Sequence, residues 1–284
     1  MITYNMALNI TPVTNHRERE KGVIVYPVYS RRSAGLSIGI NLYPEKKSCQ
    51  FNCPYCEVFP FFNNAEFSLE QLKDDLRSAV TAAIKQNIPI KDICFSGNGE
   101  PTLSPFFTDA LTLAEEIRKE TSPSADLVII TNGTGLLQPE VFSLLKCTAV
   151  KNDSLNIWLK LDAGTPEWYE KINRCKIPHK ELIEKIKEFV SSAPVTIQTM
   201  LCAVNAEPPP ETEIKAWLNL VQELAVSAES GGKIRKVQLY GKARSAPEDP
   251  LASELPAEYL EERAESLRNI LIKKRISTPV VVYY

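Results

Sequence analysis

Short apolar runs alternate with longer amphipathic stretches along most of the chain. The short runs are rich in β-branched residues, which is typical of strands, and the longer stretches repeat apolar residues at helical spacing. The predicted strands are Leu36–Leu42, Ile93–Ser96, Leu127–Thr131, Leu155–Leu161, Val195–Leu201, Lys236–Tyr240 and Pro279–Tyr283. The predicted helices are Leu69–Gln86, Phe106–Lys119, Glu140–Leu145, Glu181–Ser191, Glu211–Ala225 and Ala257–Lys273.

The first predicted helix has a clear start and one apolar face. Ser68 is a favourable N-cap residue, and Gln71 stands at the reciprocal capping position three residues later. Its apolar residues fall on one side of a helix with 3.6 residues per turn. These residues are Leu69, Leu72, Leu76, Val80 and Ala83.

Strand–helix alternation predicts parallel strands joined by right-handed crossovers. Six such units fit a barrel or partial barrel better than a long open sheet. In either arrangement chemistry collects at the loops after the C-terminal ends of the strands. Polar or Gly-bearing segments occur there, at Gly97–Thr102, Asn132–Gly135 and Asp162–Thr165. We interpret residues 1–30 as a peripheral lead-in and residues 31–284 as a single barrel domain.

Composition is that of an ordinary globular protein, with 44% hydrophobic and 24% charged residues. The formal net charge of −2 gives no global basic field for nucleic acid. Met1–Asn15 lacks the features of a signal peptide, and no apolar run is long enough for a membrane helix. We therefore expect a cytoplasmic protein whose seven cysteines are ligands or core residues rather than disulfides.

Three of the cysteines follow the first predicted strand in the sequence Cys49-Gln-Phe-Asn-Cys53-Pro-Tyr-Cys56. Thiols at this C-x3-C-x2-C spacing can converge on one metal centre. A closed structural site needs four ligands, whereas three leave one position for a substrate or cofactor. An iron–sulfur cubane held by three thiolates has one iron without a protein ligand.

Other readings of the cysteines remain open. A zinc-stabilised binding module without catalysis would need a fourth ligand from His16 or His179, and neither lies near the loop in the sequence. The three thiols could also be unconnected core residues, and an electron-transfer protein is a further alternative. The remaining cysteines are interpreted as structural; they are Cys94, Cys147, Cys175 and Cys202.

The spacing, with aromatic Tyr55 before the last cysteine, resembles the signature of radical S-adenosylmethionine (SAM) enzymes. The resemblance implies a radical SAM core, a partial (βα)6 TIM-type barrel. It also implies a [4Fe–4S] cluster on Cys49, Cys53 and Cys56, whose open iron binds SAM. Reduction of the cluster then cleaves SAM to methionine and a 5′-deoxyadenosyl radical, with the cofactors performing the radical step.

Segments downstream extend the resemblance. Gly97-Asn-Gly-Glu100 is similar to the family's GGE element, which receives the SAM amino group, although Asn98 replaces the commonest glycine. Gly97 and Gly99 let the backbone approach closely, and Glu100 suits an ammonium group. A glycine-rich turn that caps a helix is the structural alternative.

Later strands supply further candidates for SAM contacts. Thr131-Asn132-Gly133 resembles the family's TNG element. Lys160-Leu-Asp162-Ala ends the fourth predicted strand, where the family binds the SAM carboxylate and ribose. An ordinary ion pair between Lys160 and Asp162 is the alternative. Gln198 is a polar residue in an apolar run, and Tyr240 lies in a segment similar to the one that contacts adenine.

Within the family, SGNGEPT, TNG, KLDA and VQLYGKAR are most similar to the wyosine-synthase-like group, which modifies tRNA. Two features disfavour tRNA: the chain is slightly acidic, and no cysteine precedes Cys49 to hold a second cluster. The substrate therefore stays unidentified among tRNA, protein and small molecules. The resemblance also implies an external one-electron reductant such as flavodoxin or ferredoxin.

Overall fold

The structure, a computed structural model, describes residues 22–284 and divides into two compact units. Of the described residues, the first unit holds 22–48 and 60–129, and the second holds 49–59 and 130–284. His16 and most of the predicted lead-in lie outside the described residues. Between residues 22 and 284, no helix combines the length and apolar character needed to cross a membrane.

The first unit contains four adjacent strands. β1 (Val25–Ser30) pairs antiparallel with β2 (Gly35–Ile40). β2, β3 (Ile90–Phe95) and β4 (Asp126–Thr131) follow in that order as parallel neighbours. β1 was not predicted, because Pro27 interrupts its apolar pattern; proline is tolerated there because β1 is an edge strand.

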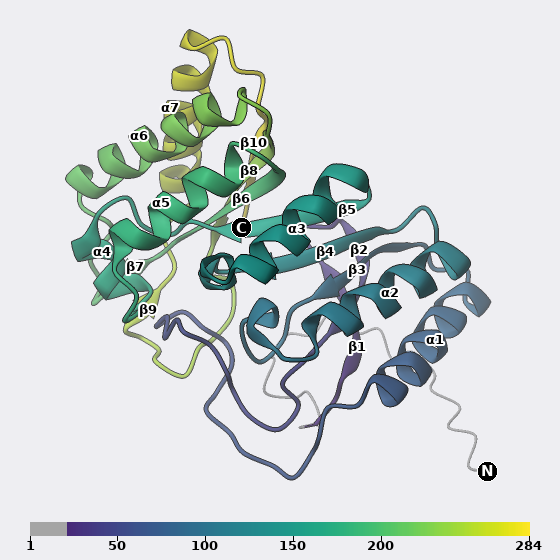
Figure 1. Ribbon diagram of the computed structural model, residues 1–284. Coiled ribbons are helices and arrows are strands. Elements are labelled where there is room, and N and C mark those ends of the chain that lie inside the picture. The colour runs from purple at the N-terminus through teal and green to yellow at the C-terminus, as the bar shows by residue number, and fades with distance from the viewer. Residues whose placement is uncertain (1–21) are drawn as a thin grey trace. The chain divides into compact units, whose positions relative to one another are not determined.

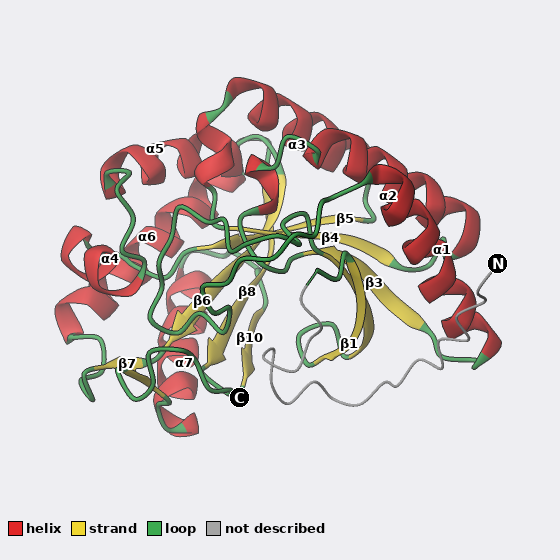
Figure 2. Ribbon diagram, turned by 90° about the horizontal axis from the view of Figure 1, so that it is seen from below, coloured by secondary structure: helices red, strands yellow, loops and turns green. Residues whose placement is uncertain are grey.

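Two helices of the first unit, α1 (Leu69–Lys85) and α2 (Phe107–Thr121), lie together beside its strands (Figure 2). The Ser68 side chain accepts a hydrogen bond of 3.3 Å from the Gln71 amide, which confirms the predicted N-cap. The predicted apolar face of α1 is also confirmed, with four of its residues buried: Leu72, Leu76, Val80 and Ala83. A short 3-10 turn, η2 (Pro101–Leu103), precedes α2.

The second unit contains four parallel strands in the order β5 (Leu155–Lys160), β6 (Pro194–Leu201), β8 (Lys233–Gly241) and β10 (Val280–Tyr283). Two short strands, β7 (Ala203–Val204) and β9 (Ala252–Ser253), form a separate antiparallel pair. All seven predicted strands are therefore present in the two units, within a few residues of the expected bounds.

The helices of the second unit are α3 (Pro139–Lys151), α4 (Pro166–Ile172), α5 (His179–Val190), α6 (Glu211–Ala228) and α7 (Ala257–Lys273), with a 3-10 turn η3 (Thr134–Leu137). α6 and α7 lie beside β8, and α7 also contacts β10 (Figure 1). α4 was not predicted, because it is too short for a helical repeat. The Thr165 side chain caps its start, and Pro166 occupies its first turn.

Alternation along β6 separates two faces of the sheet in the second unit. The Thr199 hydroxyl accepts a hydrogen bond from the Trp217 indole of α6, so Thr199 faces the helices. Gln198 and its neighbours in register, Lys160 on β5 and Gln238 on β8, therefore share the opposite face. That face carries the polar groups described next.

Candidate functional site

The cysteine loop of the second unit rests on α4. The Asn52 amide donates a 2.8 Å hydrogen bond to the Asn173 carbonyl, just after α4. The Phe51 ring meets the Tyr169 ring edge-on, with their centroids 5.7 Å apart. The Cys56 amide donates to the Cys53 carbonyl at 3.0 Å and closes a turn between these two cysteines.

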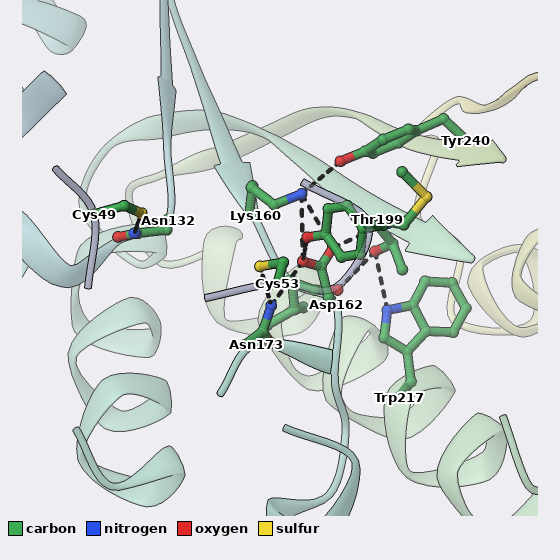
Figure 3. A network of polar contacts seen from close by, with 12 residues as sticks. Cys49, Cys53, Asn132, Lys160, Asp162, Asn173, Thr199, Trp217 and Tyr240 are labelled. Carbon is green, nitrogen blue, oxygen red and sulfur yellow. Dashed lines mark hydrogen bonds and ion pairs between the residues drawn. The ribbon is translucent and has the colours of Figure 1, made fainter. Parts of the chain in front are cut away.

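None of the three loop cysteines forms a disulfide, and their surroundings differ: Cys49 is exposed, Cys53 is buried and Cys56 is half-buried. Two asparagine amides point at two of the sulfurs (Figure 3). The Asn132 Nδ2 lies 3.4 Å from the Cys49 Sγ, and the Asn173 Nδ2 lies 3.5 Å from the Cys53 Sγ.

Asp162, directly after β5, accepts hydrogen bonds from four groups (Figure 3). The donors are the Tyr55 hydroxyl, the Lys160 ammonium at 3.3 Å, the Asn173 amide at 2.9 Å and the Met200 backbone amide at 3.0 Å. Its side chain is fully buried. The carboxylate thus joins the cysteine loop, β5, β6 and the segment after α4.

Lys160 lies between two tyrosines. Its Nζ is 5.1 Å from the ring centroids of both Tyr55 and Tyr240, and it donates a hydrogen bond to the Tyr240 hydroxyl. Burial disfavours the ammonium, but the Asp162 carboxylate, Tyr240 and Cys53 together outweigh that effect and hold the pKa of Lys160 above its ordinary value. The ion pair of Lys160 and Asp162, which was the structural alternative to a SAM contact, is present and buried.

Burial raises the pKa of the Cys53 thiol to about 11, and the Asp162 charge acts in the same direction. Lys160, Tyr55 and Asn173 oppose the rise. Iron binding replaces the thiol proton and neutralises the thiolate, so a metal centre would remove the penalty that burial imposes on Cys53.

The donor set fits a [4Fe–4S] cluster. Three cysteines outside any disulfide lie on one short loop, and two of their sulfurs accept hydrogen bonds from amide N–H groups, as iron–sulfur ligands commonly do. Among residues 22–284, no three or more His, Cys, Asp and Glu side chains surround the position of a single metal ion. A cubane cluster does not require its ligands to converge on a single metal ion, because each thiolate binds a different iron.

His179 has other partners in the structure. Its Nε2 lies 3.3 Å from the Ala163 carbonyl oxygen, and its ring packs against Tyr169 with centroids 5.1 Å apart. Burial lowers the pKa of His179, which favours the neutral imidazole. The position of His179 at the start of α5 is thus accounted for by its packing against Tyr169 and its contact with the Ala163 backbone.

The glycine-rich loop after β3 belongs to the first unit. Gly99 lies so close to Ser48 that an added Cβ would come 1.9 Å from the Ser48 carbonyl oxygen. Gly97 has a φ of +118°, which favours glycine. The sequence predicted that glycine here lets the backbone approach closely, and Gly99 does lie in such close contact, with the Ser48 backbone.

Asn98 and Glu100 both have local partners in the first unit. The Asn98 side-chain amide donates a 3.1 Å hydrogen bond to the Tyr43 carbonyl, which a glycine could not do. The buried Glu100 carboxylate accepts from the amide and hydroxyl of Thr102 and caps η2. The turn-capping arrangement is thus present, and a role of this loop toward SAM stays a prediction.

Gln198 is buried and donates a 2.6 Å hydrogen bond to its register neighbour Gln238. Within residues 22–284, neither the Gln198 Oε1 nor the Gln238 Nε2 has a hydrogen-bond partner. Two unpaired buried amide atoms are costly, so this pair, which lies next to Lys160, could still form hydrogen bonds with a bound group.

Sequence reasoning missed Asn173 and Glu213. Trp168, Tyr169 and Ile172 share one buried side of α4, but a helix of seven residues repeats this spacing over too few turns to indicate that it ends just before Asn173. The buried Glu213 carboxylate on α6 accepts from the amides of Gly164 and Thr165, at 2.6 and 2.8 Å. It fixes the turn that follows Asp162, and no local sequence pattern marks it.

Comparison with solved structures identifies the fold. SuiB of Streptococcus suis bound to S-adenosylmethionine matches with a TM-score of 0.63 at 14% identity, over 87% of this chain and 50% of SuiB. TYW1 with a lysine–pyruvate adduct matches with a TM-score of 0.53 at 14% identity, over 82% and 73%. Native anSMEcpe with bound AdoMet matches with a TM-score of 0.52 at 13% identity, over 85% and 63%. These likenesses confirm the predicted α/β class with a partial TIM-type barrel.

Two curated relatives are UPF0026 proteins of Helicobacter pylori. The one from strain J99 is 27% identical over 187 residues, which cover 64% of this chain and 54% of the relative. The one from strain 26695 is 31% identical over 175 residues, which cover 61% and 52%. The chain therefore spans about half the length of these relatives.

The profile of the Radical SAM superfamily matches residues 47–213, which is more than half of the chain and includes all three loop cysteines. Two of the structural neighbours were solved with S-adenosylmethionine bound. The protein is thus an enzyme that belongs to the Radical SAM superfamily.

Proposed function

We propose that Cys49, Cys53 and Cys56 hold a [4Fe–4S] cluster and that the enzyme uses it to cleave SAM reductively. The single observation that carries this proposal is a loop with three cysteines outside any disulfide, two of whose sulfurs have amide donors. When bound, the cluster would supply the electron that cleaves SAM, and its open iron would receive the cofactor. An external one-electron reductant such as flavodoxin or ferredoxin would supply that electron.

The chain's own residues orient this centre. Asp162 holds the loop through Tyr55, and the Asn173 carbonyl fixes Asn52. Lys160 and Tyr240 form a cationic and aromatic pair on the same side of the sheet, which suits a carboxylate and an adenine ring. Gly97, Asn98, Gly99 and Glu100 stay proposed contacts of the SAM amino group through the family resemblance.

The experiment measures iron and sulfide per chain after anaerobic reconstitution, for the wild type and seven Cys→Ala variants. We expect variants of the three loop cysteines to lose most of the cluster, because each supplies one of only three thiolates. Matched controls, Cys94→Ala, Cys147→Ala, Cys175→Ala and Cys202→Ala, should keep iron near the wild-type level. The reduced wild type should also release 5′-deoxyadenosine from SAM.

Two results would overturn the proposal. A colourless protein that retains zinc after purification would favour the binding-module alternative. A control variant that loses its iron while keeping its melting temperature would mean a fourth protein ligand, and SAM would then have no open iron.

The substrate class stays open among tRNA, protein and small molecules, and tRNA is not the class we favour. SuiB was solved with its precursor peptide and TYW1 with a lysine–pyruvate adduct, but at 14% identity they share only the fold with this chain. The wyosine-synthase-like grouping remains a proposal from the sequence motifs. With a net charge of −2, the protein should bind bulk tRNA weakly at physiological salt. Tight, salt-resistant binding in a filter or anisotropy titration would favour tRNA modification.

A further inference from the structure

The orientation of the Asn132 side chain is fixed by its neighbour in the turn after β4. Its Oδ1 accepts hydrogen bonds from both the amide and the hydroxyl of Thr134, at 2.9 and 2.6 Å. These two donors identify the oxygen of the amide, since an NH2 group cannot accept from an N–H. The Nδ2 group is therefore the end that faces the Cys49 Sγ at 3.4 Å (Figure 3).

The orientation of Asn173 is fixed independently. Its Nδ2 lies 2.9 Å from the Asp162 carboxylate, which in its ionised form only accepts hydrogen bonds. The same Nδ2 lies 3.5 Å from the Cys53 Sγ, so its two hydrogens serve the carboxylate and the sulfur. The backbone carbonyl of Asn173 accepts a hydrogen bond from the backbone amide of Asn52, which fastens the loop one residue before Cys53.

Both asparagines are buried, with exposed fractions of 3% for Asn132 and 1% for Asn173. Water therefore does not compete for these amides, and a buried N–H group without an acceptor would be costly. Each sulfur provides an acceptor for one of these amides. Both amide donors are thus fixed in direction and shielded from solvent, while the Cys49 side chain that accepts from Asn132 is exposed.

Resting on the proposed function, we propose that Asn132 and Asn173 are positioning residues that donate to two cluster-binding cysteines and raise the reduction potential of the cluster. A hydrogen bond to a cysteine sulfur withdraws negative charge from the ligand. It stabilises the reduced cluster more than the oxidised one, because the reduced cluster carries one more negative charge. Asn132, directly after β4, would thus act on the cluster through Cys49, and Asn173, directly after α4, would act through Cys53.

The test measures the midpoint potential of the reconstituted protein by a redox titration monitored by electron paramagnetic resonance, with iron and sulfide per chain determined alongside. The variants are Asn132→Leu, Asn173→Leu and the double variant, because leucine keeps the approximate shape and removes the donor. The matched control is Asn156→Leu on β5. The Asn156 Oδ1 accepts a hydrogen bond from Arg235 at 2.8 Å, and this bond does not involve a cysteine.

We expect each single variant to keep its cluster and shift the potential to more negative values, the double variant to shift it further, and Asn156→Leu to leave it unchanged. Asn173 also donates a hydrogen bond to Asp162, so Asn173→Leu could fail to fold. In that case the Asn132→Leu variant alone provides the test. Unchanged potentials in variants with an intact cluster would overturn this inference and leave the proposed function standing. A wild type that takes up no iron would overturn both.

Discussion

The hydroxyl of Tyr55, on the cysteine loop, donates a hydrogen bond to the carboxylate of Asp162, which lies 107 residues later in the chain. Both residues are buried, and both belong to the second unit. Burial and the Asp162 charge raise the pKa of Tyr55 well above its ordinary value, so the phenol keeps its proton and remains a donor. The contact fastens the loop between Cys53 and Cys56 to the end of β5.

Replacing Tyr55 with Phe should lower the free energy of unfolding by about 1–2 kcal/mol, because a buried carboxylate loses a charge-assisted donor. Three other donors still serve Asp162, so the fold should survive. Urea titration measures the effect. The control is Tyr29→Phe, since Tyr29 is 44% exposed. Equal stability of the two variants would mean that the Tyr55 bond contributes nothing.

Gly99→Ala should destabilise the first unit by about 1–3 kcal/mol, the usual cost of overpacking. The new Cβ would come 1.9 Å from the Ser48 carbonyl oxygen, and backbone cannot move aside as a flexible side chain can. Gly241→Ala is the matched control, because its Cβ would meet Leu260 at an ordinary 3.5 Å. Thermal unfolding compares the melting temperatures of the two variants. A Gly99→Ala variant that melts at the wild-type temperature would contradict the close contact between Gly99 and Ser48.

The Gln198–Gln238 pair should show strong coupling in a double-mutant cycle. Either single change to Met leaves the other amide without its partner and should cost about 1–3 kcal/mol. The double change removes every unpaired polar atom of the pair and should cost less than the sum of the single changes. Unfolding free energies of the four proteins measure the coupling, and strictly additive costs would show that the pair does not act as a unit.

Asp92 should make stability depend on pH in the acidic range. Burial raises its pKa, and Asp126, its register neighbour on β4, acts in the same direction against the hydrogen bonds of Ser33 and Ser37. The folded state then binds a proton more readily than the unfolded state. The stability contributed by Asp92 is thus greatest below its unfolded pKa and declines as pH rises through the raised folded value.

Asp92→Asn should remove this decline. The measurement is the free energy of unfolding from about pH 4 to about pH 7, across the range where a carboxyl with a raised pKa titrates. The control is Thr112→Ser on the exposed side of α2, which changes no titratable group and should leave the slope unchanged. A wild type and an Asp92→Asn variant with parallel profiles would show that the buried carboxyl does not titrate in this range.

Local pattern was sufficient for most of the secondary structure. The apolar repeat of α1 and its Ser68 cap were readable because both depend on residues within a few positions of each other. The pattern failed at β1, where Pro27 interrupts an edge strand, and at α4, which is too short to show a repeat. The cysteine motif was also local, since Cys49, Cys53 and Cys56 lie on one loop.

The sequence by itself thus determined the order of elements, the apolar faces and the three thiols, because each follows from neighbours along the chain. Only the tertiary structure decided which side chains meet the thiols. Asn173 reaches Cys53 across 120 residues, and Glu213 reaches Thr165 across 48. Such contacts arise when parallel strands bring their C-terminal ends to one edge, and no periodicity in the sequence records which loop will lie beside another.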